Sequence, residues 1–356
     1  MSEAASYALV MNAEFIDQLH QRIERATRRI YIQVMTYDGD DAGLGVSERL
    51  IDAAARGVDV RLIVDSFAFR YISDTRSTDP SVAEEVAATH AMFDRMEASG
   101  INVVYTNPFG RILQFGGMRN HKKLFVLDDV AYIGGINISD HNFEWLDFNV
   151  EVSTPSIVSI LAEDFEATSR GEYHSLSGPI ITNAHLGPKF YDMVDSAKES
   201  IVLASPYALD LSLANRLIDA PAPHKVVIAP EHNNYLTFRL ADRHLRQKLI
   251  GGGVEVRSFE DFFHAKFVIF DNEQVMVGSS NFGVHSFTCN QELGVVIDDP
   301  VFVSQLIEMV NKTEETTVRT SRVDYVVGGL VAAYVRTGIL MYEKVFSKHA
   351  PTITTR

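Results

Sequence analysis

The sequence predicts an α/β protein built from two similar units, each a mixed sheet flanked by helices. Three observations support this fold class. A strand with the pattern His-x-Lys occurs twice, at residues 121–123 and 264–266. A similar alternation of helix and strand patterns precedes each copy, and a turn with a second apolar strand follows each. Repetition on this scale indicates a duplicated α/β unit.

In the first unit, a helix that opens at Glu14 ends at Arg28-Arg29, before the apolar strand 30–34. A later helix ends at Gly100, and a strand at 101–103 follows. Glycine commonly ends a helix, and short runs rich in Val and Ile are typical of strands.

The second unit repeats these elements in the same order. A helix that opens at Lys189 ends at Ser200, before the strand 201–204. Glycines at 251–253 end the next helix, and a strand at 254–256 follows. We expect such a fused pair to meet about a pseudo-twofold axis.

The second His-x-Lys strand, 263–270, is rich in Val, Ile and Phe and has the period of two that a strand requires. His264 and Lys266 therefore point to the same face of the sheet. Asp271 follows five residues after the lysine, at a predicted turn. A returning strand then leads to the loop 278–281, which contains Ser279 and Asn281.

The first copy has the same spacing. His121 and Lys123 are two residues apart, Asp128 follows five residues after the lysine, and a glycine loop leads to Asn137. The return is one residue shorter, which a shorter hairpin turn would absorb. A single histidine on such a strand is as readily a hydrogen-bonded core residue as a catalytic one, and its repetition favours the catalytic interpretation.

The doubled pattern His-x-Lys-x4-Asp, followed by Gly-Ser or Gly-Gly and then x-Asn, resembles the phospholipase D superfamily. Three further stretches resemble its cardiolipin synthase branch, namely 119–123, 134–140 and 145–147. The resemblance covers most of residues 10–310. It implies a phospholipase D-like unit at 1–171, a second at 172–315, and leaves a basic, apolar helical tail at 316–356.

The resemblance implies that both motifs meet in one site that binds a phosphodiester. His121 would attack phosphorus to form a phosphohistidine, and His264 would act as general acid and then general base. Imidazole suits both tasks because it titrates near neutral pH. The two lysines would neutralise the non-bridging oxygens, and the two asparagine amides, with the Ser279 hydroxyl, would donate hydrogen bonds to them. The predicted catalytic residues are His121, Lys123, Asn137, His264, Lys266 and Asn281.

Five further residues are predicted to support the site, namely Asp128, Glu151, Asp271, Ser279 and Glu292. The two glutamates lie at similar offsets beyond the hairpins. The resemblance implies that Glu292 orients His121 and that Glu151 orients His264, although each is also compatible with a solvated strand end. The two aspartates are expected to hold the hairpin turns. Arg119 and Trp145 either line the mouth of the site or have a structural role.

No metal ion or other cofactor is expected. The sequence has no His-Glu-x-x-His motif and no cysteine pair, and the lysine beside each histidine would repel a cation. The predicted partners are a phospholipid and an acceptor, which is either an alcohol or water; the oligomeric state is unknown.

The resemblance implies a phosphatidyltransferase of the cardiolipin synthase or phospholipase D type. The alternatives are hydrolysis to phosphatidic acid, a nuclease or another phosphodiesterase of the superfamily, and a catalytically inactive scaffold. The formal net charge of −15 argues against a nucleic-acid partner, because nonspecific binding of phosphate backbones requires a basic surface.

A single cysteine, Cys289, fits a reducing compartment. The N-terminal residues form no long apolar run, and no stretch reaches the ~20 apolar residues of a membrane-spanning helix. We therefore expect a cytoplasmic protein, with peripheral attachment to a membrane as the alternative. The segment 319–348 is basic and apolar, so it packs on the protein or a partner copy, or lies on an anionic membrane surface.

Overall fold

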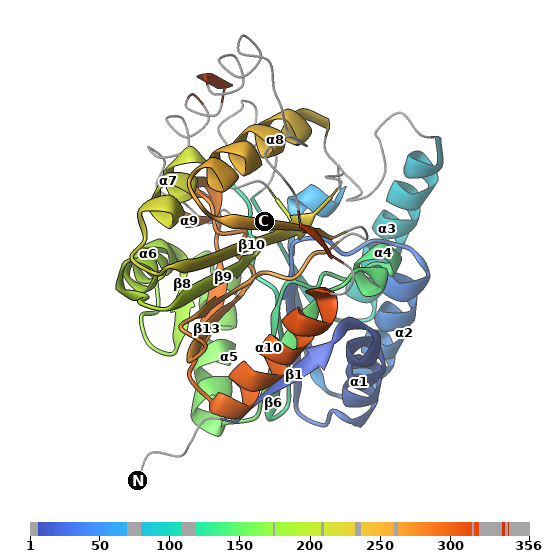
Figure 1. The fold of residues 1–356 in the computed structure, drawn as a ribbon. Coiled ribbons are helices and arrows are strands. Elements are labelled where there is room, and N and C mark those ends of the chain that lie inside the picture. Colours follow the sequence, from blue (N-terminus) through green and yellow to red (C-terminus); the bar gives the residue numbers. More distant parts are fainter. Residues whose placement is uncertain are drawn as a thin grey trace. The chain divides into compact units, whose positions relative to one another are not determined.

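The computed structural model of the chain describes residues 6–69, 80–107, 118–173, 175–207, 210–231, 236–259, 263–314, 317–319, 337, 338 and 341. The chain divides into two compact units, with the division between His174 and Ser175 (Figure 1). Most of the predicted tail at 316–356 lies outside the described residues, and of its predicted helix only residues 337, 338 and 341 are described, all three as helical. Residues 317–319 of that tail form a strand.

The first unit contains a seven-stranded mixed sheet in the order β1-β7-β6-β5-β2-β3-β4. Strands β2, β3 and β4 are parallel to one another, and the remaining pairs are antiparallel. Its elements are β1 (Tyr7–Met11), α1 (Asn12–Arg25), β2 (Arg29–Val34), α2 (Asp41–Ala55), β3 (Asp59–Asp65), η1 (Ser66–Phe69), α3 (Pro80–Ala98), β4 (Asn102–Thr106), β5 (Leu124–Leu127), β6 (Val130–Gly134), α4 (Asp140–Glu144), β7 (Phe148–Val152) and α5 (Pro155–Ser169).

The second unit repeats this topology in the order β15-β11-β10-β9-β12-β13-β14-β8, with β15 as an additional strand at one edge. The duplication that the sequence predicts is thus confirmed strand by strand. Its elements are β8 (Ile180–Thr182), η3 (Asn183–His185), α6 (Leu186–Ser196), β9 (Ser200–Ala204), α7 (Leu211–Asp219), β10 (His224–Pro230), α8 (Leu236–Gly251), β11 (Glu255–Phe259), β12 (Phe267–Phe270), β13 (Gln274–Gly278), α9 (Val284–Thr288), β14 (Leu293–Ile297), α10 (Pro300–Glu314) and β15 (Thr317–Arg319).

Helices cover both faces of the first sheet because its central strands are apolar on both sides. In β2, Ile30 and Ile32 join the core beneath α1, which contributes the fully buried Phe15. Tyr31 points to the opposite face and stacks on Phe165 of α5 with ring centroids 4.9 Å apart. Burying one such large side chain stabilises the fold by about 1.5–3 kcal/mol.

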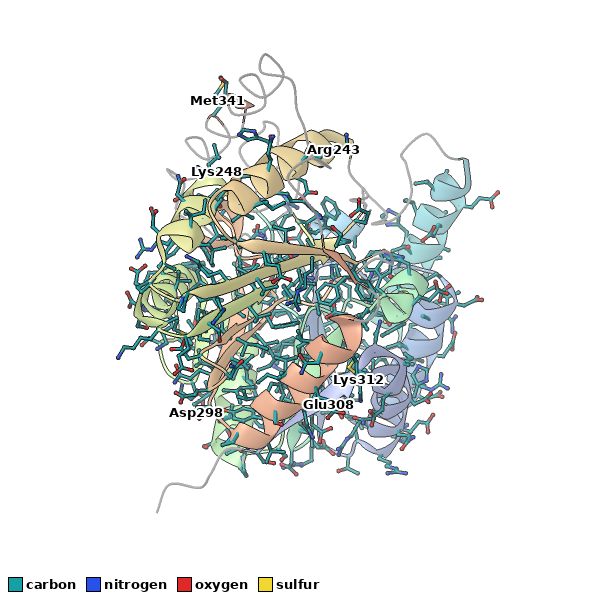
Figure 2. All side chains as sticks on the ribbon, viewed as in Figure 1. Arg243, Lys248, Asp298, Glu308, Lys312 and Met341 are labelled. Atoms are coloured by element: carbon teal, nitrogen blue, oxygen red, sulfur yellow. The ribbon has the colours of Figure 1, made fainter. Side chains whose placement is uncertain are left out.

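The second unit has an equivalent core, in which Phe190 of α6 packs with Leu203 and Val268 of the sheet. The long helix α10 presents a polar face, where Glu308 and Lys312, four residues apart, form an exposed ion pair at 2.8 Å (Figure 2). Its apolar residues Phe302 and Leu306 are buried, which is the pattern of an amphipathic helix.

Asp128 and Asp271 hold the His-x-Lys hairpins to the preceding strands. Both have positive φ angles, 51° and 53°, a conformation that Asp tolerates better than most residues. Asp128 accepts hydrogen bonds from the backbone N–H groups of residues 27–29 at 2.9–3.0 Å. Asp271 accepts the equivalent bonds from residues 198–200 at 2.7–3.0 Å.

A buried ion pair distinguishes the first unit from the second. The ammonium group of Lys122 lies 2.9 and 2.8 Å from the two carboxylate oxygens of Asp164 on α5, and both side chains are almost fully buried. In the second unit Ala265 occupies the middle position of His-x-Lys, and Met309 lies at the equivalent position of the equally long α10. Apolar residues therefore stand at both positions that the ion pair occupies in the first unit.

Copying the apolar pair into the first unit tests this equivalence. We expect Lys122→Ala or Asp164→Met alone to lower the free energy of unfolding by about 3–5 kcal/mol, because each leaves a buried charge without its partner. The double variant should match the wild type within about 1 kcal/mol. Urea unfolding of the four proteins measures this. A double variant as unstable as the sum of the two single variants would contradict the interpretation.

The hairpin aspartates predict an acid-dependent loss of stability. Partial burial raises the pKa of Asp128 and of Asp271, but three backbone donors outweigh it, so both pKa values lie below the ordinary 3.8. Their contribution is therefore present above about pH 4 and is lost as the pH falls below it. Asp128→Asn should cost about 1–2 kcal/mol at pH 7, and the difference from the wild type should shrink by pH 3.

The control is Asp129→Asn, because the neighbouring Asp129 is exposed and pairs with the exposed Arg28. Its effect on urea unfolding should be within about 0.5 kcal/mol at pH 7. Equal effects of the two substitutions, or a pH-independent loss for Asp128→Asn, would rule out the proposed linkage.

Candidate active site

The two His-x-Lys segments have the same local geometry in their separate units. His121 is 8% exposed and His264 is 5% exposed. Lys123 is fully buried, and its ammonium group donates a hydrogen bond to the carbonyl oxygen of His121 at 2.9 Å. Lys266 donates the equivalent bond to the carbonyl of His264. Each motif therefore holds a buried lysine ammonium group against the backbone of a nearly buried histidine.

Asn137 connects the loop after β6 to the end of β2. Its side-chain oxygen accepts hydrogen bonds from the backbone N–H groups of Met35 and Thr36, both at 3.2 Å. Its amide nitrogen donates to the side-chain oxygen of Asn142 at 3.4 Å. Asn137 is thus held in a defined orientation close to the carboxyl end of a parallel strand.

Asn281 has a different environment in the second unit. Its backbone N–H donates to the Ser286 hydroxyl at 3.2 Å, and its carbonyl accepts from Ser205 at 3.0 Å. Its side-chain oxygen is buried and makes no hydrogen bond with any residue in the described part of the chain. The backbone of Asn281 is therefore fixed, and its side-chain oxygen retains an unused capacity to accept a hydrogen bond.

Ser279 and Glu292 form a buried pair in the second unit. The Ser279 hydroxyl donates to the Glu292 carboxylate and accepts from the Leu293 N–H at 3.1 Å. Glu292 is fully buried, and its other oxygen accepts from the Asn290 side chain at 3.2 Å. These contacts hold the carboxylate rigidly at the start of β14.

Glu151 and Glu292 do not occupy equivalent positions of the two sheets. The strand registers pair Gly134 with Asn149 and Gly278 with Gly294, so Glu292 corresponds to the residue two before Asn149, which is Asp147. Backbone hydrogen bonds agree, because Asn12 N–H donates to Asp147 at 3.1 Å and Asn183 N–H donates to Glu292 at 3.0 Å.

Asp147 also has the contacts expected of a counterpart. It is 1% exposed, and its carboxylate accepts from its neighbour's N–H at 2.8 Å. A Cβ atom added to Gly135 would lie only 2.5 Å from a carboxylate oxygen of Asp147, just as Ser279, the residue equivalent to Gly135, contacts Glu292. Glu151 instead forms an ion pair with Arg22 of α1 at 3.4 Å. The sequence signal for Asp147 was the stretch 145–147, which resembles the cardiolipin synthase branch. The sequence alone suggested no role for this aspartate.

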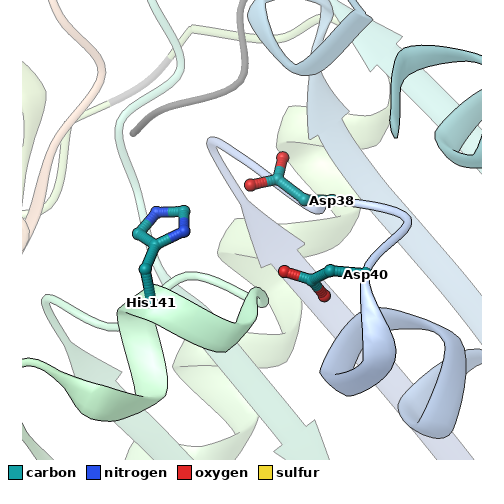
Figure 3. Close-up of side chains that lie close together, drawn as sticks. All are labelled: Asp38, Asp40 and His141. Carbon is teal, nitrogen blue, oxygen red and sulfur yellow. The ribbon is translucent and has the colours of Figure 1, made fainter. Parts of the chain in front are cut away.

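A third group of polar side chains was not recognised from the sequence. Asp38, Asp40 and His141 place their carboxylate oxygens and ring nitrogens within 4.8 Å of one another, with His141 on α4 and the aspartates on the loop after β2 (Figure 3). Such donors suit a divalent cation.

Asp40 already has a structural role in this group. It caps the N-terminus of α2 by accepting from the Gly43 N–H at 2.9 Å, and it accepts from the Asp140 N–H at 2.7 Å. Burial raises the pKa of Asp40 to about 6 in spite of these donors. The expectation that the protein needs no metal remains a prediction.

Among the described residues, no helix combines the length and the apolar character that crossing a bilayer demands. The sequence-based expectation of a peripheral or cytoplasmic location is a separate matter and stays a prediction.

Comparison with known proteins identifies the family. The family model described as "Cardiolipin synthase, PLD-like domain" matches residues 19–168 and 190–313, one segment in each unit. Cardiolipin synthase A of Proteus mirabilis (strain HI4320) is 29% identical over 318 residues, which are 77% of this chain and 62% of the relative. Probable cardiolipin synthase YwiE of Bacillus subtilis (strain 168) is 24% identical over 321 residues, 80% of this chain and 61% of the relative. The chain thus spans about three fifths of the length of these relatives.

Solved structures share the fold. Phosphatidylserine synthase of Haemophilus influenzae Rd KW20 matches with a TM-score of 0.71 at 14% identity, covering 96% of this chain and 93% of that one. Polyphosphate kinase of Porphyromonas gingivalis matches with a TM-score of 0.62 at 13% identity, covering 96% of this chain and 53% of that one. With both His-x-Lys motifs intact and the family model matching in each unit, the chain belongs to the phospholipase D-like family of cardiolipin synthase domains.

Proposed function

We propose that the chain is a phosphatidyltransferase that moves a phosphatidyl group from a phospholipid to an alcohol. The observation that carries this proposal is the duplicated geometry, in which each unit buries a lysine ammonium against the carbonyl of its own motif histidine. The names of the relatives support a cardiolipin synthase reaction. In this proposal the two motifs meet about a pseudo-twofold axis and form a single site.

In this proposal the reaction proceeds in two displacement steps at phosphorus. A ring nitrogen of His121 attacks phosphorus, the bond from phosphorus to the leaving alcohol oxygen breaks, and His264 gives its proton to that oxygen. The acceptor alcohol then loses its proton to His264 and attacks phosphorus, and the bond to His121 breaks. Both histidines return to their starting protonation states. No atom changes its oxidation state, so the reaction needs no redox cofactor.

The lysines stabilise the charge that develops on the non-bridging oxygens. Lys123 and Lys266 are both almost fully buried, and the attraction between charges is stronger in such an environment than in water. The fixed amide of Asn137 and its partner Asn281 supply further polar contacts to the phosphodiester. Removal of one preorganised donor in such a site costs about 2.7–4 kcal/mol of transition-state stabilisation.

We assign the orienting carboxylates to Asp147 and Glu292. In this proposal Glu292 orients His121, as the family resemblance implies, and Asp147 takes the place of Glu151 in orienting His264. This assignment moves the role that the sequence suggested for Glu151 onto Asp147, because Asp147 shares the strand position of Glu292. A carboxylate on the second ring nitrogen fixes the tautomer and supports the imidazolium form.

Water competes with the alcohol as the acceptor in the second step. Attack by water would give phosphatidic acid. A nuclease of the same superfamily is the second candidate, and the net charge of −15 disfavours it. The lipid substrate requires contact with a bilayer surface, for which the basic segment 319–348 is the proposed site.

Incubation of the full chain with phosphatidylglycerol in liposomes or detergent, with EDTA present, tests the function. We expect cardiolipin and glycerol, identified by mass, and at least a ~10³-fold loss of rate for His121→Ala. Phosphatidic acid as the main product would establish hydrolysis. Cleavage of labelled single-stranded DNA without any lipid product would replace the proposal with the nuclease.

The assignment of the carboxylates has its own test. Asp147→Asn should lower kcat about 10²- to 10⁴-fold with little change in KM, because the imidazole loses its orienting charge. Glu151→Gln should lower kcat by less than about threefold, because the Glu151 carboxylate pairs with Arg22 of α1 and not with a motif histidine in this proposal. Steady-state kinetics on phosphatidylglycerol, with circular dichroism to check folding, separates the two. The reverse order of effects would restore the role to Glu151.

A further inference from the structure

Asp65, the last residue of β3, lies at the centre of a buried polar cluster. It is fully buried, and each carboxylate oxygen has two donors. One oxygen accepts from Arg119 at 2.8 Å and from the Phe67 N–H at 2.9 Å. The other accepts from the Asn120 N–H at 2.7 Å and from the Asn107 side chain at 3.0 Å. Four donors around one carboxyl group match its ionised form.

These contacts fix the residue directly before His121. Asp65 holds the backbone of Asn120, and Gln33 of β2 donates to the Asn120 side chain at 2.8 Å. Arg119 is only 4% exposed and also donates to the Asn107 carbonyl at 3.1 Å. Arg119 therefore ties the loop after β4 to the His121 segment, which decides its role in favour of the structural alternative.

The second unit replaces three members of this cluster with residues that lack polar side chains. Strand register places Pro230 at the position of Asp65. Asp59 begins β3 opposite Arg29, and His224 begins β10 opposite Ser200, so the two seven-residue strands start at the same position and end at Asp65 and Pro230. Register also places Ala204 at the position of Gln33. Phe263 precedes His264 as Asn120 precedes His121. The polar anchor at these three positions is thus a feature of the first unit.

We propose that Asp65 is a positioning residue that holds the His121 segment in its reactive geometry, and that the two motif histidines are unequally anchored for this reason. The inference rests on the proposed function, in which His121 must attack phosphorus in line with the leaving oxygen. A misplacement of about 1 Å in such a step costs about 10²-fold in rate. A general acid tolerates more freedom than an in-line nucleophile, so the anchor lies where displacement is most harmful.

Asp65→Asn is the decisive substitution because it keeps shape and volume. The amide has a single acceptor oxygen, so it cannot accept from all four donors. We expect kcat for phosphatidyl transfer to fall about 10- to 100-fold, with KM within about threefold of the wild type. Rapid-quench measurements should show slower formation of the covalent enzyme adduct and an unchanged rate of its breakdown by the acceptor.

The double variant Lys122→Ala/Asp164→Met is the matched control. It removes another buried ion pair of the same unit, one that is formed by the residue after His121. In the wild type, the whole lysine side chain separates the Lys122 ammonium group from the backbone. We therefore expect kcat of the double variant to stay within about threefold of the wild type. Equal losses of kcat in the control and in Asp65→Asn would reduce Asp65 to an ordinary stabilising residue and overturn the proposal.

Amide hydrogen exchange of the full chain gives a measurement that does not depend on activity. In Asp65→Asn, exchange of the peptide 118–124 should accelerate about tenfold or more, while that peptide in the control variant stays protected. Unchanged exchange in Asp65→Asn would refute the positioning role, even if the wild type proved inactive on lipids. Failure of the proposed function is therefore distinguishable from failure of this inference.

Gln33→Ala provides a milder variant if Asp65→Asn fails to fold. It introduces the residue that the second unit has at this position and leaves the Asp65–Arg119 pair intact. We expect a three- to tenfold loss of kcat and a smaller acceleration of exchange in 118–124. Wild-type kinetics together with wild-type exchange in this variant would also refute the inference.

Discussion

The fold must accommodate a buried lysine ammonium beside a histidine in each unit, and this constraint shapes the surrounding structure. Moving such a charge out of water is costly unless hydrogen bonds compensate for the lost hydration. Both lysines are extended along the strand so that their ammonium groups reach the carbonyl two residues back. The strand continues into a hairpin whose turn an aspartate fastens to the neighbouring strand. The position of the charge is thus set by backbone geometry, which the duplication reproduced in both units.

Local pattern was enough to predict the two units, the hairpins and the role of the turn aspartates, because each depends on spacing within a few residues. The similar offsets of Glu151 and Glu292 did not reveal that they lie at different sheet positions, because an offset along the chain does not determine strand register. The segment from His121 to the start of β7 is two residues shorter than the segment from His264 to the start of β14. Residues at similar distances from the two histidines therefore lie at different positions of the two sheets. The registers of Gly134 with Asn149 and of Gly278 with Gly294 give the alignment.

The polar groups around Asp65 and around Asp38 escaped prediction for a different reason. Their members come from segments that are far apart in the sequence and meet only when the sheet forms. Arg119 contacts Asp65 across 54 positions of the chain, and His141 meets the aspartates of another loop. Neither set has a spacing that a periodic pattern can signal. Conversely, the positions of Lys122 and Asp164 hold Ala265 and Met309 in the second unit, so residue chemistry alone does not identify equivalent positions.

Strand β15 has a consequence for the second sheet as a whole. It pairs antiparallel with β11 through residues 317–319, and so it replaces the five-residue edge of β11 with an edge strand of three residues. Open edges of this kind recruit strands from other molecules. A fragment that stops at the end of α10 would leave the longer edge of β11 unpaired, so β15 shortens the border at which strands of other molecules could add to this sheet.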